Sequence, residues 1–174
     1  NINLIIKTFK PKIYNRDWEL LKEYVRIDPR IKIIEEDFTR KNLYNLYSIC
    51  DIYLSLHRAE GYGRNLAEAS ILGLEVIATD YGGNTEFCHG ESFHKVPYKL
   101  IPVKPDSYPH WRKQYWADPN IDSASEILIK VFNKCLSLRK NKYIMEVSNL
   151  DNIFSKEICG KRYKKRLNEI GILS

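Results

Sequence analysis

The stretch Asp51–Asp80 reads DIYLSLHRAEGYGRNLAEASILGLEVIATD, and its order of apolar and polar residues decides the fold class. Asp51–Leu56 and Leu74–Thr79 are short apolar runs with the length of buried strands. Between them, the residues from about Asn65 to Leu72 predict a helix, and Gly73 stands where a helix commonly ends. This stretch therefore predicts a strand–helix–strand unit with two parallel strands.

The residues upstream show the same alternation of strand and helix. Strands are predicted at Asn3–Lys7 and Ile31–Ile34, and a helix is predicted over Asp17–Ile27. Thr39 is the predicted N-cap of a further helix that runs through Ser48. The alternation predicts an α/β fold, a Rossmann-like parallel sheet with helices on both faces. Ligands of such sheets bind beyond the carboxyl ends of the strands.

The residues downstream break this alternation. Glu91–Pro119 is rich in prolines and aromatic residues and predicts a long ordered loop with one edge strand near Leu100–Val103. Three aromatic residues are expected to hold this loop against the core, with stacking on a bound ligand as the alternative: Trp111, Tyr115 and Trp116. Helices are predicted at four further places: a short one capped by Asn84, then Asp122–Leu138, Tyr143–Val147 and Asn152–Ile170.

The composition is that of an ordinary globular protein. With 174 residues, of which 44% are hydrophobic and 29% charged, the chain predicts a single domain, residues 1–174, with its own core. No apolar run is long enough to span a bilayer, and no secretory signal is visible. The four cysteines are widely spaced, which predicts reduced thiols in a cytoplasmic protein. His89, His94 and His110 lack ligand spacing, so surface roles and no metal site are predicted.

The basic residues concentrate in the terminal helix. The net charge is +6, and Lys161–Arg166 contains five of the cations. A solvated helix face is the expected role of this cluster, because few apolar residues accompany it. Peripheral contact with the inner membrane face is the alternative, and we expect no nucleic-acid partner.

Two glutamates, Glu60 and Glu68, flank the turn that leads into the predicted helix of the opening stretch. Gly61 and Gly63 let backbone amides approach a ligand closely, and the start of a helix favours phosphate. A carboxylate beside a diphosphate is unfavourable, so Glu60 is expected to face a sugar. Glu68 can accept two hydrogen bonds from a vicinal diol such as a ribose. The order of these groups suits a nucleotide-sugar.

The run EGYGRNLAEASILGLEVIATDYGGNTEF, Glu60–Phe87, resembles the E-x7-E motif of retaining GT-B glycosyltransferases of the GT4 class. The resemblance covers nearly the whole chain and extends to bacterial members in surface-polysaccharide synthesis. It implies the C-terminal half of a GT-B fold, the half that binds a UDP- or GDP-linked sugar donor. It also implies transfer of a hexose to a polysaccharide or lipid-linked acceptor, without a further cofactor or a metal.

The same resemblance assigns roles to individual residues. Glu60 matches the catalytic glutamate beside the donor sugar, and Glu68 matches the residue that holds the ribose hydroxyls. Glu36–Phe38 matches the region of the nucleobase. The remaining donor-binding positions are Gly61, Tyr62, Gly63, Asn65 and Leu66. Two neighbours are added from their position past the strand end, His57 and Arg58, with a structural histidine as the alternative for His57.

The chain also departs from the pattern of that class. The N-terminal acceptor domain is absent, as is the first strand of the donor domain with the Arg/Lys pair that binds the diphosphate. Only Lys7, Arg58 and Arg64 supply positive charge nearby. Because the chain lacks an initiator methionine, we expect a fragment of a longer protein that is inactive in isolation. The alternatives are a non-catalytic Rossmann-like binding module and a nucleotide-sugar epimerase of GT-B architecture.

Overall fold

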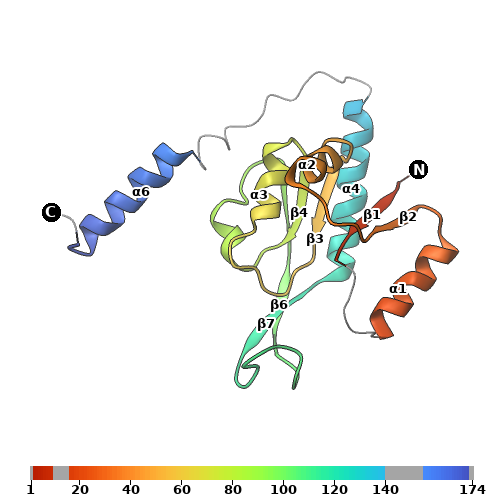
Figure 1. Ribbon diagram of the computed structural model, residues 1–174, viewed down its shortest axis with the longest axis horizontal. Coiled ribbons are helices and arrows are strands. Elements are labelled where there is room, and N and C mark those ends of the chain that lie inside the picture. Colours follow the sequence, from red (N-terminus) through yellow and green to blue (C-terminus); the bar gives the residue numbers. More distant parts are fainter. Residues whose placement is uncertain (1, 10–15, 140–154, 173–174) are drawn as a thin grey trace. The chain divides into compact units, whose positions relative to one another are not determined.

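Figure 1 shows the computed structural model, which describes residues 2–9, 16–139 and 155–172. The chain groups into two compact units, Asn1–Tyr44 and Asn45–Ser174.

The first unit is a small strand–helix–strand motif. Strand β1 (Leu4–Lys7) pairs in parallel with β2 (Ile31–Ile34), with Leu4 opposite Ile31. Helix α1 (Arg16–Ile27) connects them. The predicted strands and helix are confirmed to within one residue at each end. Parallel strands need such a crossover because a tight turn cannot bring them side by side.

Helix α2 (Arg40–Ser48) runs across the boundary between the two units. Thr39 caps it as predicted, because its Oγ1 accepts a hydrogen bond from the Asn42 amide at 3.2 Å. The cap satisfies one of the amides that the first turn of a helix leaves unpaired.

The second unit is built on a three-stranded parallel sheet in the order β3–β4–β5. Its strands are β3 (Ile52–Ser55), β4 (Glu75–Thr79) and β5 (Phe93–Val96). Helices α3 (Arg64–Ile71) and α4 (Ile121–Arg139) lie on either side of β4 in Figure 1. The predicted α/β class with parallel strands and covering helices is therefore confirmed.

The core of this unit lies between β4, β5 and α4. Ile77 and Val96 of the sheet are fully buried against Ala124 and Val131 of α4. All five residues of β4 are buried, as expected of a central parallel strand covered on both faces.

The prediction of a long loop over Glu91–Pro119 is wrong, although the edge strand predicted near Leu100–Val103 is confirmed with shifted ends. The segment contains β5 and an antiparallel hairpin of β6 (Tyr98–Pro102) and β7 (Tyr115–Pro119). The sequence FHKV of β5 lacks an apolar run, and its pairing with β4 depends on distant residues. Pro102 and Pro119 end their strands, where a missing amide donor is tolerated.

Two other boundaries differ from the predictions. Asn84 lies inside the short 3₁₀ helix η1 (Gly83–Glu86) and does not cap it; it is 1% exposed. The terminal helix α6 (Lys156–Glu169) is capped by Ser155, so it begins later than predicted. The predicted helical segment Tyr143–Val147 and the predicted start at Asn152 lie outside the described residues.

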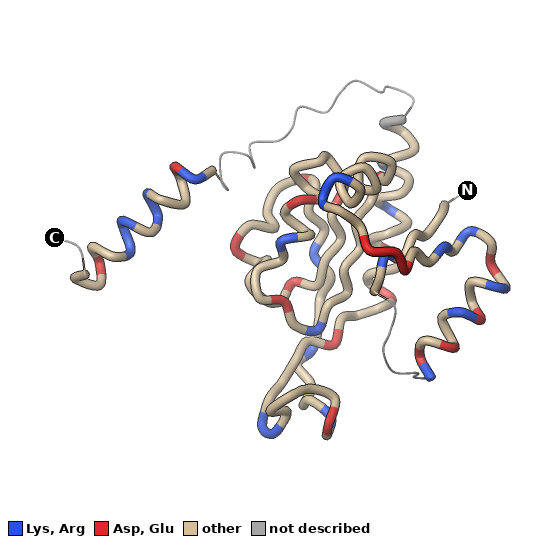
Figure 2. The backbone as a smooth tube through the Cα atoms, viewed as in Figure 1, with Lys and Arg blue, Asp and Glu red and all other residues tan. Residues whose placement is uncertain are grey.

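Helix α6 carries basic residues along most of its length, as the blue segments in Figure 2 show. Tyr163 is 73% exposed on this helix. Within the part of the chain that the structure describes, no helix combines the length and apolarity needed to cross a membrane.

A buried carboxylate ties the sheet to α4. Glu75 is 3% exposed, and its two oxygens lie 2.6 Å from His94 Nε2 and 2.7 Å from Lys134 Nζ. The surface role predicted for His94 is therefore wrong, since it is a structural partner of Glu75. Pairing a buried carboxylate in this way offsets the cost of removing it from water.

Cys88, which is 3% exposed, gives a prediction about pH. Burial raises the pKa of its thiol from 9.0 to about 11. Below pH 9 the thiol is protonated in both the folded and the unfolded chain, so it leaves stability unchanged. Between about pH 9 and 11 only the unfolded chain loses this proton, so stability falls as the pH rises.

We expect Cys88 to contribute a loss of about 1 kcal/mol in unfolding free energy between pH 8 and pH 10. Urea titrations of the wild type and of Cys88→Ala at both pH values measure it. The variant has a lower stability throughout but should lose less on going to pH 10. An identical pH dependence in the two proteins would contradict the prediction.

Candidate functional site

The turn after β3 carries most of the residues expected to bind a ligand. It runs over His57–Gly63 and leads directly into α3. Gly63 takes the N-cap position with a φ of 88°, in the left-handed region that favours glycine. A Cβ there would lie 2.8 Å from Leu66 Cδ1, so packing excludes a side chain as well.

The Glu60 carboxylate folds back onto its own turn. Its Oε1 accepts hydrogen bonds from the backbone amides of Gly63 at 2.9 Å and of Tyr62 at 3.3 Å. These are two of the amides expected to face the sugar and phosphate of a ligand. In this structure Glu60 holds the turn in shape, and its Oε2 accepts no hydrogen bond within the described residues.

A second glycine loop packs backbone to backbone against this turn. The Gly83 amide donates to the Glu60 carbonyl at 3.1 Å. A Cβ on Gly83 would lie 1.9 Å from the Gly61 carbonyl oxygen, and one on Gly82 would lie 2.5 Å from the Glu60 carbonyl oxygen. Both glycines therefore allow close backbone contact between the loops that follow β3 and β4.

Glu68 lies on α3 with its side chain 12% exposed, and the Arg64 Nε is 3.9 Å from its Oε1. The charges of both motif glutamates affect the pKa of the Tyr53 phenol in β3. Burial raises the pKa of Tyr53, hydrogen bonding with Asn65 lowers it, and the charges of Glu60 and Glu68 raise it further. The carboxylates of Glu60 and Glu68 therefore both lie near the Tyr53 phenol.

Sequence analysis did not identify Tyr53 as a site residue. Its ring also packs edge-on against Tyr47, with centroids 5.7 Å apart. The sequence indicates only that Tyr53 lies in the strand directly before the turn. Such a position is equally typical of a core residue, so only the neighbouring side chains distinguish a site residue from a core residue.

His57 and Arg58 are already engaged by other parts of the second unit. Both His57 ring nitrogens are paired, Nδ1 with Ser55 Oγ at 3.0 Å and Nε2 with the Tyr81 carbonyl at 2.8 Å. The Arg58 guanidinium lies 2.9 Å from Asp118. These contacts favour the structural alternative for His57, and they hold Arg58 against β7.

The remaining donor-binding candidates differ in exposure. Tyr62 is 48% exposed and packs against Phe87, with ring centroids 5.3 Å apart. Gly61 and Asn65 are exposed, so both can reach a ligand. Leu66 is 2% exposed, so its side chain belongs to the core and only its backbone remains for a ligand.

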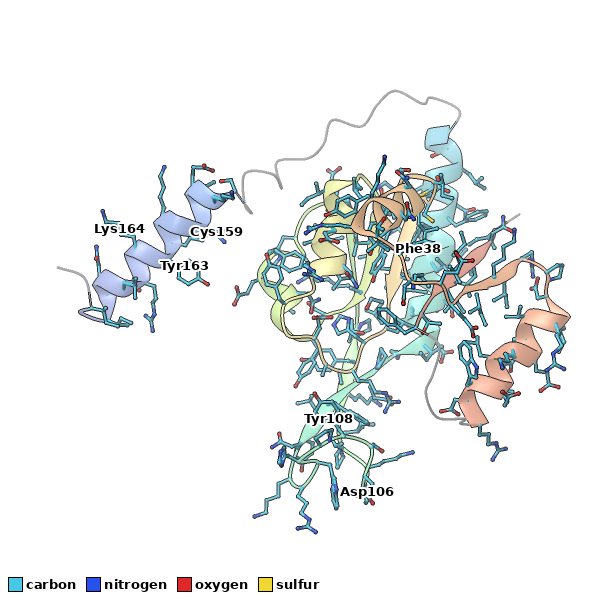
Figure 3. The ribbon with its side chains drawn as sticks, in the orientation of Figure 1. Phe38, Asp106, Tyr108, Cys159, Tyr163 and Lys164 are labelled. Carbon is cyan, nitrogen blue, oxygen red and sulfur yellow. The ribbon has the colours of Figure 1, made fainter. Side chains whose placement is uncertain are left out.

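The first unit carries the candidate for a base pocket. Phe38 follows β2 and is labelled in Figure 3. The Lys7 ammonium lies 5.3 Å from the centre of its ring and 5.0 Å from that of Phe9. Among the residues described, no group of three or more potential ligands could hold a metal ion.

Comparison with known proteins finds a family that matches part of the chain. Residues 18–98 match the family Glycosyl transferases group 1. This glycosyltransferase segment includes Glu60, Glu68 and both glycine loops. The prediction of a glycosyltransferase-type domain is thereby confirmed at this coarse level. No curated protein matches the chain.

Sixteen chains of solved structures also match. One of them is described as "Crystal structure of GtfA/B complex" and shares 16% sequence identity with a TM-score of 0.49. The match covers 97% of this chain and 36% of that chain. This chain thus spans about a third of the length of that one.

Proposed function

We propose that this chain is the donor-binding part of a retaining glycosyltransferase of the GT4 class. The whole enzyme would transfer a hexose from a UDP- or GDP-sugar to a polysaccharide or a lipid-linked acceptor. The observation that carries the proposal is the position of Glu60 and Glu68 around one turn, beyond the carboxyl end of β3 and within a glycosyltransferase segment.

The structure gives this turn a defined shape before any ligand arrives. Gly83 packs on Gly61, and the Glu60 carboxylate holds the amides of Tyr62 and Gly63. A preformed turn supports the proposal because ligand binding then costs little ordering of the backbone.

Glu60 is proposed as the catalytic residue. Breaking the bond between the sugar and the diphosphate develops positive charge at the anomeric carbon. A carboxylate placed beside that carbon stabilises the charge. Glu60 can reach a sugar with Oε2 while Oε1 keeps its hydrogen bonds to the turn.

The other proposed contacts follow the layout of a nucleotide-sugar. Glu68 would accept hydrogen bonds from the two ribose hydroxyls, and Arg64 at 3.9 Å would keep its carboxylate oriented. The start of α3 would face the diphosphate.

Calorimetry of the chain with UDP- and GDP-sugars tests the donor site directly. A hydrogen bond to a charged group contributes about 1.5–3 kcal/mol, so Glu68→Ala should weaken binding by roughly 10- to 100-fold. Glu126→Ala is the matched control, because Glu126 is an exposed residue of α4. Equal affinities for the wild type and Glu68→Ala would contradict the proposed ribose contact.

The alternatives give different results in the same experiments. A non-catalytic binding module would bind its ligand equally well with Glu68→Ala. An epimerase would interconvert free nucleotide-sugars without any acceptor. The glycosyltransferase proposal fails if a longer form that includes the preceding residues binds no nucleotide-sugar.

A further inference from the structure

The hairpin β6–β7 and its connecting loop, residues 98–119, form an aromatic arm that extends away from the three-stranded sheet (Figure 1). Its base is anchored in the second unit. The Ala117 amide donates to the Arg58 carbonyl at 2.9 Å, and Asp118 pairs with the Arg58 guanidinium. The arm therefore has a fixed root and a projecting tip, at which Asp106 and Tyr108 are labelled in Figure 3.

The two faces of the hairpin differ. Ile101 and Trp116 are paired across the strands on one face, where the Arg58 guanidinium lies 5.1 Å from the Trp116 ring centre. On the other face Pro102 lies opposite Tyr115, next to Leu100. Leu100 is 54% exposed and Tyr115 is 58% exposed. This face is covered at the root of the arm, where Ala117 is fully buried and Tyr98 packs against Tyr81, and it exposes Leu100 and Tyr115 farther along.

The loop at the tip has a specific backbone shape. Asp106, His110 and Lys113 all have φ between 56° and 60°, in the left-handed region that few residues other than glycine adopt. The Val103 amide donates to the Gln114 carbonyl at 2.9 Å and closes the loop. Backbone strain of this kind is concentrated at functional surfaces, so the tip is a candidate for contact with a partner.

The tip also carries an excess of positive charge. Lys104, Arg112 and Lys113 are exposed there, and Asp106 is the only acidic residue between positions 103 and 114. Tyr108 is 65% exposed beside them, and the Arg112 guanidinium lies 5.5 Å from the ring of Trp111. Tyrosine, tryptophan, lysine and arginine together are typical of protein surfaces that lie in the headgroup region of a membrane.

We propose that the aromatic arm binds the surface of an anionic lipid bilayer, with its tip in the headgroup region. The aromatic side chains would lie at the interface between headgroups and acyl chains, and the three cations would contact lipid phosphates. This inference goes beyond the proposed function and does not depend on it.

The composition of the arm favours a membrane over two other occupants. A neutral glycan would leave the excess cations without partners. A second copy of the chain would bring the same net charge of +6 toward the tip, which is repulsive. An anionic bilayer offers phosphates to the cations of the tip and an apolar interior to the exposed face with Leu100 and Tyr115.

Vesicle co-sedimentation of the 174-residue chain tests the proposal. The vesicles are phosphatidylcholine alone, or phosphatidylcholine mixed with phosphatidylglycerol. We expect binding to the anionic vesicles, weakened by high salt. The triple variant Lys104→Gln, Arg112→Gln and Lys113→Gln should lower the partition coefficient by roughly 100-fold, because each cation near such a surface contributes about fivefold and the three factors multiply.

A matched variant on α6 separates the arm from net charge. Lys161→Gln, Lys164→Gln and Lys165→Gln remove the same number of exposed cations and should have a much smaller effect. An equal loss in both variants overturns the proposal, as does an absence of vesicle binding by the wild type. All six side chains are exposed, so the variants should fold, and circular dichroism checks this.

Tryptophan fluorescence locates the contact on the chain. Brominated lipids in the anionic vesicles should quench the emission, and Trp111→Phe should remove most of this quenching. Trp18→Phe, in the first unit, should leave it intact. The reverse pattern of quenching overturns the proposal. The proposal is also overturned if the chain binds a neutral polysaccharide, loses that binding in Tyr115→Ser and does not bind the vesicles.

Discussion

Glu60→Gln is expected to lower kcat for glycosyl transfer by about 10²–10³-fold in a form of the protein that carries an acceptor-binding part. The substitution removes the negative charge proposed to stabilise the developing positive charge on the sugar. It keeps an acceptor oxygen for the amides of Tyr62 and Gly63, which Glu60 Oε1 engages at 3.3 and 2.9 Å. The turn should therefore retain its shape, and donor affinity should change little.

The measurement is steady-state transfer from UDP- and GDP-sugars together with thermal unfolding of the same samples. Glu91→Gln is the matched control, because Glu91 is exposed before the amino end of β5, at the opposite edge of the sheet. A loss of kcat in Glu60→Gln with an unchanged melting temperature supports the catalytic role. Unchanged kcat in Glu60→Gln contradicts that role and leaves Glu60 as a residue that shapes the turn.

Gly83→Ala is expected to lower the free energy of unfolding by about 3 kcal/mol, which corresponds to a fall of about 6–12 °C in melting temperature. The added Cβ would lie 1.9 Å from the Gly61 carbonyl oxygen and 2.9 Å from its carbonyl carbon. Both atoms belong to the backbone, so one of the two loops has to move. That movement would also break the hydrogen bond from the Gly83 amide to the Glu60 carbonyl and weaken binding of a nucleotide-sugar.

Gly61→Ala is the control for this prediction. Gly61 lies in the opposing loop, a Cβ on it would have nothing within 4 Å, and its backbone is outside the left-handed region. We expect its unfolding free energy to stay within about 0.5 kcal/mol of the wild type. Urea titrations of the three proteins make the comparison. Similar losses in Gly61→Ala and Gly83→Ala would show that the contact between the loops is not the cause.

Much of the α/β pattern could be predicted from local sequence. The apolar runs of β1, β3 and β4 and the helical spacing of α1, α3 and α4 are confirmed with small shifts at their ends. Gly73 has a φ of 81°, as expected where α3 gives way to β4. Such features depend on residues within a few positions of one another, so they can be recognised in the chain.

The remaining elements depend on pairing between distant residues. Strand β5 contains His94 and Lys95, and it forms because β4 offers a free edge and Glu75 binds His94 at 2.6 Å. Of the hairpin β6–β7, only an edge strand near Leu100–Val103 was predicted, because the prolines of the segment suggested irregular structure elsewhere. These prolines end the strands, a distinction that becomes visible only when the register of the two strands is known.

The candidate site divides in the same way. Local sequence is enough to predict that Glu60 and Glu68 flank a glycine turn between a strand and a helix, because strand, turn and helix are local structures. The packing of Gly83 on Gly61, the hydrogen bonds from the turn amides to Glu60 and the place of Tyr53 near both carboxylates are visible only in the folded chain. These contacts join segments separated by up to some twenty residues, and close packing, which no local pattern encodes, determines them.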